Sequence, residues 1–333
     1  MKKKAAIITS VILLLCTLTA CMTAKTVSGT GMADNGDTAK ISIVTTIFPE
    51  YDWVRVILGD KADRAEVTML MDNGVDMHSY QPTAEDILKI SDCDIFIYVG
   101  GESDNWVDDA LKEAVNKDMK VINLFEVLGD KVKEEEAVEG MEEEDWHEQE
   151  YEVEYDEHVW LSLRNAQILC DKIAEVIEQT DPECADVYKK NADDYRSKLD
   201  SLDKEYEAAV SQASVKTLLF ADRFPFRYMT DDYGLDHYAA FAGCSAETEA
   251  SFETVIFLAD KTDELGLTAI MTIEGSDKRM AETVRDNSKS KDQQILTLDS
   301  LQGLTSEDAA SGTTYLSVMT HDLEVIKQAL NVH

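Results

Sequence analysis

Eight short runs of β-branched and other apolar residues constrain this 333-residue chain more than any other feature. Stretches with the three-and-four spacing of an amphipathic helix separate the runs, so the pattern is a repeated βα unit. Such units build parallel sheets that are covered by helices. The sequence therefore predicts an α/β protein with two similar four-stranded parallel-sheet lobes. The runs are 41–48, 65–71, 94–99 and 119–124 in the first half, and 216–221, 235–241, 267–273 and 294–298 in the second.

A long charged segment, Pro182 to Ser211, separates the two groups of strands. Its apolar side chains recur at spacings of three and four, and it contains neither glycine nor proline after Pro182. We expect one helix of about eight turns. A stiff helix that connects the lobes predicts little opening and closing between them. The alternative to a connecting helix is one that packs wholly within one domain. The expected boundaries are an N-terminal lobe at 41–181, the linking helix at 182–212 and a C-terminal lobe at 213–333.

The first 20 residues have the pattern of an export signal. Three lysines precede an apolar run from Ala5 to Leu15, which is too short to span a membrane and leads to Leu18-Thr-Ala-Cys21. We expect a lipoprotein signal peptide at 1–20 and acylation of Cys21, with an ordinary secretory signal as the alternative. Residues 21–40 are interpreted as a polar tether. The rest of the protein would then be extracytoplasmic and lipid-anchored to the cell membrane.

The net charge narrows the choice of partner. A formal charge of −36 argues against nucleic acid, whose phosphates would be repelled, and suits cations or simple solubility. We expect a monomer. Apart from Cys16 and Cys21, the cysteines form no CxxC pair and no zinc-finger spacing, so one disulfide and free buried thiols both stay open. These cysteines are Cys93, Cys170, Cys184 and Cys244.

One segment is far more acidic than the rest. From Glu134 to Glu157, 14 of 24 residues are Asp or Glu. Such charge density cannot bury a core, so we expect an exposed, poorly ordered loop. Most acidic runs are merely solvated, but this one leads directly into Asp156-Glu157-His158, which suggests weak, exchangeable capture of divalent cations. The expected accessory ligands are Glu142, Glu143, Glu144, Asp145 and His147.

Two histidines follow strands of the first half. His78, in Gly74-Val-Asp-Met-His-Ser-Tyr, comes after the second predicted strand, and His158 comes after the fourth. Both should emerge at the carboxyl edge of one parallel sheet, where open α/β domains hold ligands. A lone histidine is more often solvated or structural, but two imidazoles on one rim suit zinc or a related transition metal. The other histidines lie in no such motif and are expected to be structural: His237, His321 and His333.

Both histidine segments resemble motifs of a known family. Gly74 to Asp86 is similar to a GxDPHxYxPTxxD segment, and Asp156 to Ala166 to a DPHxWLDPxNA segment, of bacterial zinc/manganese ABC-transporter substrate-binding lipoproteins (ZnuA/TroA-like, cluster A-I). The resemblance covers Ile41 to Leu330. It implies two pseudo-symmetric lobes, one rigid helix between them and a metal in the cleft. The implied function is capture of Zn²⁺, with Mn²⁺ less favoured, and delivery to a membrane permease, so the protein is expected not to be an enzyme.

The second half departs from the family pattern. The resemblance implies a His or Glu ligand ten residues before Tyr233-Gly-Leu, but this chain has Arg223 there. Arginine offers no lone pair to a metal. We expect Asp222 to ligate instead, with Arg223 pairing an acidic residue nearby. Cys244 and Glu247 are the alternatives, although a glutamate such as Glu247 is also favoured at a helix N-terminus for electrostatic reasons.

The fourth ligand implied by the resemblance is an Asp after the last strand. It falls on Asp299, which could equally be a helix N-cap. The expected metal ligands are therefore His78, His158, Asp222 and Asp299, with Zn²⁺ as the bound substrate. Two rival functions remain. A zinc-dependent hydrolase needs an open position for activated water, but no HExxH accompanies the histidines. A surface metal-buffering or adhesin lipoprotein would use the acidic loop itself.

Overall fold

The computed structural model describes residues 40–141, 154–245 and 250–332. In this part of the chain no helix is both long and apolar enough to cross a membrane. The expected signal peptide and nearly all of the tether lie outside the described residues.

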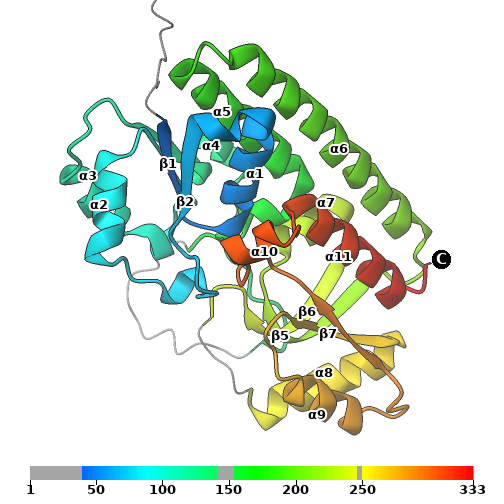
Figure 1. Ribbon diagram of the computed structural model, residues 1–333. Helices are drawn as coiled ribbons and strands as arrows, with labels where there is room; N and C mark the ends of the chain where they lie inside the picture. Colours follow the sequence, from blue (N-terminus) through cyan, green and yellow to red (C-terminus); the bar gives the residue numbers. More distant parts are fainter. Residues whose placement is uncertain (1–39, 142–153, 246–249, 333) are drawn as a thin grey trace, which may run out of the picture. The chain divides into compact units, whose positions relative to one another are not determined.

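Two four-stranded parallel sheets form the framework (Figure 1). The strand order is β2-β1-β3-β4 in the first sheet and β6-β5-β7-β8 in the second, so both halves share one topology. The eight predicted strands are confirmed, with ends that differ by at most three residues. Their bounds are β1 Ile41–Thr45, β2 Ala65–Met69, β3 Ile95–Tyr98, β4 Lys120–Asn123, β5 Thr217–Phe224, β6 Asp236–Ala242, β7 Ala269–Ile273 and β8 Gln294–Leu298.

The central strands are buried on both faces. Ile43 in β1 pairs with Ile95 in β3, and both side chains are 0 % exposed. In the second sheet Phe220 of β5 pairs with Met271 of β7, and these are also fully buried. Parallel strands covered by helices on both sides show such continuous apolar runs. The β-branched and aromatic character of the runs therefore explains both the strands and their central position.

Helices cover the sheets and join the halves (Figure 1). Short 3₁₀ turns lie among them, including η2 Met77–Ser79, η3 Glu102–Asp104 and η5 Val159–Leu161. The α-helices are α1 Phe48–Leu58, α2 Ala84–Asp92, α3 Val107–Lys112, α4 Leu124–Leu128, α5 Leu163–Thr180, α6 Ala185–Gln212, α7 Arg227–Tyr233, α8 Phe252–Leu265, α9 Arg279–Asn287, α10 Ser306–Ala310 and α11 Tyr315–Ala329.

The long helix α6 confirms the predicted connection. It has 28 residues, which corresponds to about 42 Å. Its buried stripe includes Tyr188, Tyr195 and Tyr206, and it packs on α1 and α5 of the first half and on α11 of the second. Tyr206 donates a hydrogen bond to the Met319 carbonyl oxygen at 2.6 Å. Because α6 packs on helices of both halves, the alternative of a helix buried within one domain is wrong.

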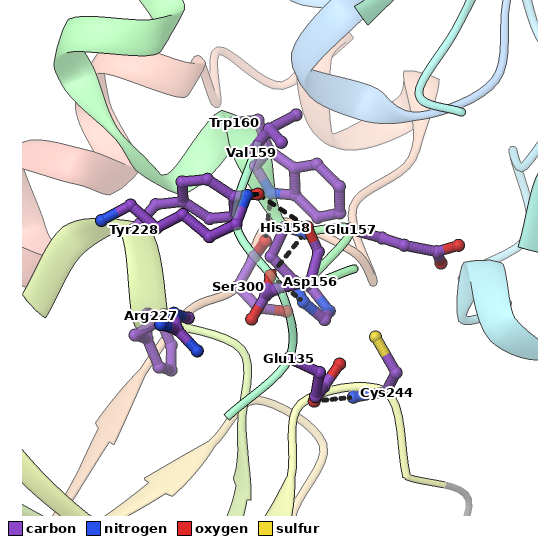
Figure 2. A network of polar contacts seen from close by, with 12 residues as sticks. Glu135, Asp156, Glu157, His158, Val159, Trp160, Arg227, Tyr228, Cys244 and Ser300 are labelled. Atoms are coloured by element: carbon purple, nitrogen blue, oxygen red, sulfur yellow. Dashed lines mark hydrogen bonds and ion pairs between the residues drawn. The ribbon is translucent and has the colours of Figure 1, made fainter. Parts of the chain in front are cut away.

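Buried polar contacts join the two halves at the carboxyl edge of the first sheet. Trp160 donates its indole N–H to the Ser300 carbonyl at 2.9 Å. Tyr228 at the start of α7 donates to the Asp156 carbonyl at 2.8 Å (Figure 2). Tyr315 at the start of α11 donates to the Trp160 carbonyl at 2.6 Å. These contacts fix the segment around His158 against the second half.

The acidic segment is ordered at both described ends, and the expectation of exposure holds for Glu134 but is wrong for Asp156 and Glu157. Glu134 and Tyr155 form an antiparallel bridge, and the Asp156 N–H donates to the Lys133 carbonyl at 2.9 Å. Asp156 and Glu157 are each only 2 % exposed. Their carboxylates are buried because histidine side chains and backbone N–H groups hydrogen-bond to them, which charge density alone does not reveal. The middle of the segment, 142–153, lies outside the described residues.

Candidate metal centre

Two imidazoles face each other at the centre of the site. Nε2 of His78 and Nε2 of His158 are 3.3 Å apart. Two nitrogens bound at about 2.0–2.1 Å to one tetrahedral zinc ion lie about 3.3–3.4 Å apart. His158 is 0 % exposed, and the side chain of His78 is 11 % exposed. The pair therefore already has the spacing that a shared ion needs.

Carboxylates hold the other nitrogen of each ring. Nδ1 of His78 lies 3.2 Å from Oε2 of Glu157 and 2.9 Å from Oγ of Ser103. Nδ1 of His158 lies 3.1 Å from Oδ1 of Asp156 (Figure 2). A ring that donates its Nδ1–H to a carboxylate presents a free lone pair at Nε2. The hydrogen bond to Asp156 thus selects the tautomer of His158 in which Nε2 can ligate a cation, and Nδ1 of His78 faces Ser103 and Glu157, which leaves its Nε2 directed at the same point.

Local turns place the two histidines. Asp76 Oδ1 accepts the His78 N–H at 3.0 Å, which fixes the turn between β2 and α2. Asp156 Oδ1 accepts the His158 N–H at 2.9 Å in the same manner before η5. Both histidines thus follow an Asx turn of the form Asp-x-His. The sequence shows this spacing in both motifs, but we had not predicted that Asp156 and Glu157 hold the rings.

A cysteine from the second half completes a group of three. Cys244 follows β6, and its Sγ, together with a ring nitrogen of His78 and one of His158, forms a group of ligand atoms within 4.8 Å of one another. Among the described residues this is the group of His, Cys, Asp or Glu side chains compact enough to share one ion. Cys244 was one of two alternatives for the second-half ligand. Within the described part of the chain, Cys93, Cys170, Cys184 and Cys244 are free thiols.

Two glycines allow the backbone to approach the site. A Cβ on Gly243 would lie 2.8 Å from the Phe224 carbonyl oxygen and 3.2 Å from Cε1 of His158. A Cβ on Gly101, whose φ is +87°, would lie 2.3 Å from Oε1 of Glu157. A larger residue at position 243 would clash with the Phe224 backbone and crowd the His158 ring, and one at position 101 would displace the Glu157 carboxylate.

Arg223 stands where the family pattern has a ligand, and it pairs an acidic residue as predicted. Its Nη2 lies 2.8 Å from Oδ2 of Asp76, in the turn that carries His78. Its Nη1 donates to the Ser245 carbonyl at 3.4 Å, next to Cys244. The guanidinium therefore connects the histidine turn of the first half with the cysteine loop of the second.

The two aspartates expected as ligands lie beside the site and outside the group of three. Asp222 and Asp299 line a cleft of about 1110 Å³ that Asp76 and Arg223 border. Asp222 Oδ1 accepts the Arg223 N–H at 3.0 Å. Asp299 Oδ1 accepts the Leu301 N–H at 2.8 Å. This bond closes a turn and is not a helix N-cap, because the following helix α10 is capped by Thr305.

The other predicted functional residues fall outside the described residues. They are the alternative ligand Glu247, the accessory ligands Glu142, Glu143, Glu144, Asp145 and His147, and the acylation site Cys21.

Burial and neighbouring charges shift the pKa values of the side chains at the site. Burial alone would lower the pKa of His158, but the nearby carboxylates, chiefly Asp156 with Glu135 and Glu157, raise it above its usual value. Burial raises the pKa of the Cys244 thiol well above its usual range, and Glu135 raises it further. Burial would raise the pKa of Glu157, but hydrogen bonds from His78 and Ser103 lower it. A divalent cation would relieve this concentration of negative charge.

One histidine outside the site fits its expected structural role. His237 in β6 stacks on Phe224 with the ring centroids 3.7 Å apart. Burial lowers the pKa of His237 to about 4, so the ring stays neutral near pH 7.

Comparison with known proteins agrees with this architecture. The family model of ZnuA, the periplasmic component A of zinc-uptake complexes, matches residues 43–329. The high-affinity zinc uptake system protein ZnuA of Bacillus subtilis is 30 % identical over 309 residues, which cover 91 % of each chain. The zinc-binding lipoprotein AdcA of Streptococcus pneumoniae is 32 % identical over 293 residues, 87 % of this chain and 56 % of AdcA.

The fold is shared with a solved zinc-bound structure. The Zn(II)-bound ZnuA-like domain of Streptococcus pneumoniae AdcA has a TM-score of 0.68 and 30 % identity, over 88 % of this chain and all of that domain. The streptococcal AdcA proteins are longer, and this chain spans about half of their length, 56 %. With its two matching sheets, its linking helix and a family match over nearly all the described residues, the chain belongs to the ZnuA family of zinc-uptake component A proteins.

Proposed function

We propose that this protein is the extracytoplasmic substrate-binding component of a zinc ABC transporter. It captures Zn²⁺ through Nε2 of His78, Nε2 of His158 and Sγ of Cys244, and it delivers the ion to a membrane permease. The observation that carries this proposal is the 3.3 Å separation of the two Nε2 atoms, which equals the spacing of two nitrogens on tetrahedral zinc. The names of the relatives, all described as zinc-binding or zinc-uptake proteins, point the same way.

The donor set favours zinc over manganese. Two imidazoles and a thiolate suit a borderline-soft ion, whereas a site with only oxygen donors in the second half would suit Mn²⁺ better. Asp222 and Asp299 supply oxygen at the neighbouring cleft, and we propose that they attract the cation toward the site. Neutral imidazole is required for ligation, so affinity should fall as the pH drops through the histidine range near ~6.5. Because the neighbouring carboxylates raise the pKa of His158, this loss begins at a higher pH than for an unperturbed histidine.

Ligand substitutions test the site. His78→Ala, His158→Ala and Cys244→Ser should each weaken zinc binding by more than about a hundredfold, since even indirect partners of a ligand are worth about 10–100-fold. The control is His321→Ala, on the exposed surface of α11. Competition titration with a chromophoric chelator gives the affinity. Unchanged zinc binding in the two histidine variants would refute the proposal.

The acidic segment separates this function from its rivals. We propose that Glu142, Glu143, Glu144, Asp145 and His147 capture metal and pass it on. Deletion of residues 142–153 leaves His158 and its carboxylate partners in place. Tight zinc binding should survive the deletion, while the rate of loading falls. Complete loss of tight binding would support a metal-buffering or adhesin role, and zinc-dependent hydrolysis of ester or peptide substrates would support a hydrolase.

The location is proposed from the N-terminal sequence and from a relative described as a lipoprotein. Cleavage before Cys21 and acylation of its thiol would anchor a monomer to the cell membrane through residues 21–40. The working parts are then the N-terminal lobe at 41–181, the linking helix at 182–212 and the C-terminal lobe at 213–333. Cys21→Ala should move the protein from the membrane fraction to the soluble fraction of cells, and continued membrane attachment would contradict the anchor.

A further inference from the structure

Glu135, a half-buried residue beside Cys244, has one buried carboxylate oxygen that no described residue satisfies. Oε1 of Glu135 accepts the Cys244 N–H at 3.3 Å. Oε2 of Glu135 is buried and has no hydrogen-bond partner among the described residues; Oε2 of Glu157 has none either, but it lies 3.2 Å from Nδ1 of His78. A buried carboxylate oxygen without a partner costs free energy, so such a group calls for a cation or a donor that the described residues do not provide. Figure 2 shows Glu135 beside Cys244 and near the segment that carries His158.

The backbone holds Glu135 firmly at this point. Its N–H donates to the Glu154 carbonyl at 2.9 Å. The N–H of Lys133, two residues earlier in the chain, donates to the Tyr228 hydroxyl at 2.9 Å. Tyr228 in turn donates to the Asp156 carbonyl, two residues from His158. Glu135 therefore stands at the start of the acidic segment, but it is fixed between the histidine segment and the cysteine loop.

Glu135 is the middle one of three consecutive glutamates. Its neighbours along the chain differ: Glu134 is exposed, and Glu136 pairs with Arg227 at 3.2 Å. Of these three consecutive glutamates, Glu135 is the one directed at the site.

Resting on the zinc site proposed above, we propose that Glu135 is the fourth metal ligand. Zinc held entirely by protein takes four donors in a tetrahedron, and His78, His158 and Cys244 supply three. A carboxylate with a thiolate also balances the two positive charges of the ion. The carboxylate of Glu135 lies outside the compact group of three, so its side chain rotates toward the ion on binding. Ligation then gives the unpartnered oxygen its partner.

Affinity measurements on the full mature chain test this ligand. Glu135→Gln keeps an oxygen that can accept the Cys244 N–H but loses the anionic donor. Zinc affinity should fall by about 10–100-fold or more. Glu134→Gln, an exposed substitution in the same segment, is the matched control and should bind as the wild type does. Equal affinities of the two variants would overturn the proposal.

Cobalt spectroscopy separates a ligand from a nearby charge. Co²⁺ bound to one thiolate gives a sulfur-to-metal charge-transfer band, which Cys244→Ser should abolish. Glu135→Cys adds a second sulfur if position 135 reaches the ion, so the band should roughly double in intensity. An unchanged band in Glu135→Cys would show that Glu135 acts through charge alone and would overturn the proposal. A wild-type protein without any sulfur band would instead refute the zinc site itself.

Discussion

At the scale of single residues, the site is organised by the side chains that contact the second ring nitrogen, Nδ1, of each histidine. Glu157 and Ser103 hold Nδ1 of His78, and Asp156 holds Nδ1 of His158. Buried carboxylates that orient imidazoles are a common support for metal ligands. Two small residues, Gly101 and Gly243, leave the space in which these groups fit.

Gly243→Ala should weaken zinc binding by about 10–100-fold, as expected when the support of a ligand is disturbed. The added methyl group would lie 2.8 Å from the Phe224 carbonyl oxygen and 3.2 Å from Cε1 of His158, so the loop that carries Cys244 must shift beside the His158 ring. Gly303→Ala is the matched control, because its methyl group would come no closer than 3.9 Å to another side chain. Chelator competition measures both. Equal affinities would show that the ring is not held as tightly as its contacts indicate.

A second residue-scale prediction concerns Glu50 at the start of α1. Burial raises the pKa of its carboxyl from 4.5 to about 8, although Thr46 and Ile47 donate hydrogen bonds to it. The protonated form therefore stabilises the fold fully below pH 4.5, and this contribution is lost as the pH rises through 8.

The free energy of unfolding of the metal-free protein should therefore decrease from pH 5 to pH 8. Glu50→Gln should remove part of that decrease, on the order of a few kcal/mol. Urea unfolding at both pH values measures it. Glu66→Gln, on the exposed surface of β2, should leave the pH dependence unchanged. Parallel pH profiles for the wild type and Glu50→Gln would contradict the buried, protonated carboxyl.

At the scale of elements, the site is built from loops that leave the carboxyl ends of strands in both sheets. The loop after β2 carries His78, and the loop after β6 carries Cys244. Arg223 near the end of β5 contacts both loops, through Asp76 and through the Ser245 carbonyl. The family pattern has a metal ligand at the position of Arg223. An arginine there is explained if it positions His78 and Cys244, the proposed ligands in the two loops.

Arg223→Ala should weaken zinc binding by about tenfold, because the two loops lose their common partner. Arg279→Ala is the control, since Arg279 lines the same cleft but its side chain is 85 % exposed and pairs with Asp277. Isothermal titration calorimetry of both variants makes the comparison. If removing Arg223 leaves affinity unchanged or increases it, the guanidinium does not position the ligands.

The sequence predicted the elements better than the second half of the site. Strand runs and the three-and-four spacing of α6 are local patterns, so all eight strands and the helix could be located from them. His78 and His158 lie in extended motifs, and the structure brings these two predicted ligands together. Cys244 was only an alternative, and Glu135, which we propose as a ligand, was not singled out within its acidic run. Their proximity depends on contacts between the halves, such as Tyr228 with Asp156, which no local pattern encodes.

At the scale of the whole described structure, α6 and buried hydrogen bonds hold the two halves together. Helix α6 packs on α1, α5 and α11, and Trp160 donates to the Ser300 carbonyl in the second half. Two or three extended connections would permit a hinge, whereas one packed helix of 28 residues resists it. The two-lobe arrangement therefore favours small adjustments on metal binding over closure of a wide cleft.

Small-angle X-ray scattering checks this rigidity. The scattering profiles of the metal-free and zinc-loaded protein should superimpose, because ligand binding moves loops at the site and leaves the sheets in place. Excess chelator in the metal-free sample is the control for residual zinc. A marked decrease in the radius of gyration on loading would contradict a rigid connection.

The central claim is that the two histidines of the first half share one zinc ion with a cysteine of the second. An anomalous-scattering map of crystals of the zinc-loaded protein, recorded on both sides of the zinc absorption edge, tests it most directly. The account predicts a single strong peak bonded to Nε2 of His78, Nε2 of His158 and Sγ of Cys244. A peak held by Asp222 or Asp299, with the Cys244 sulfur out of bonding distance, would contradict it.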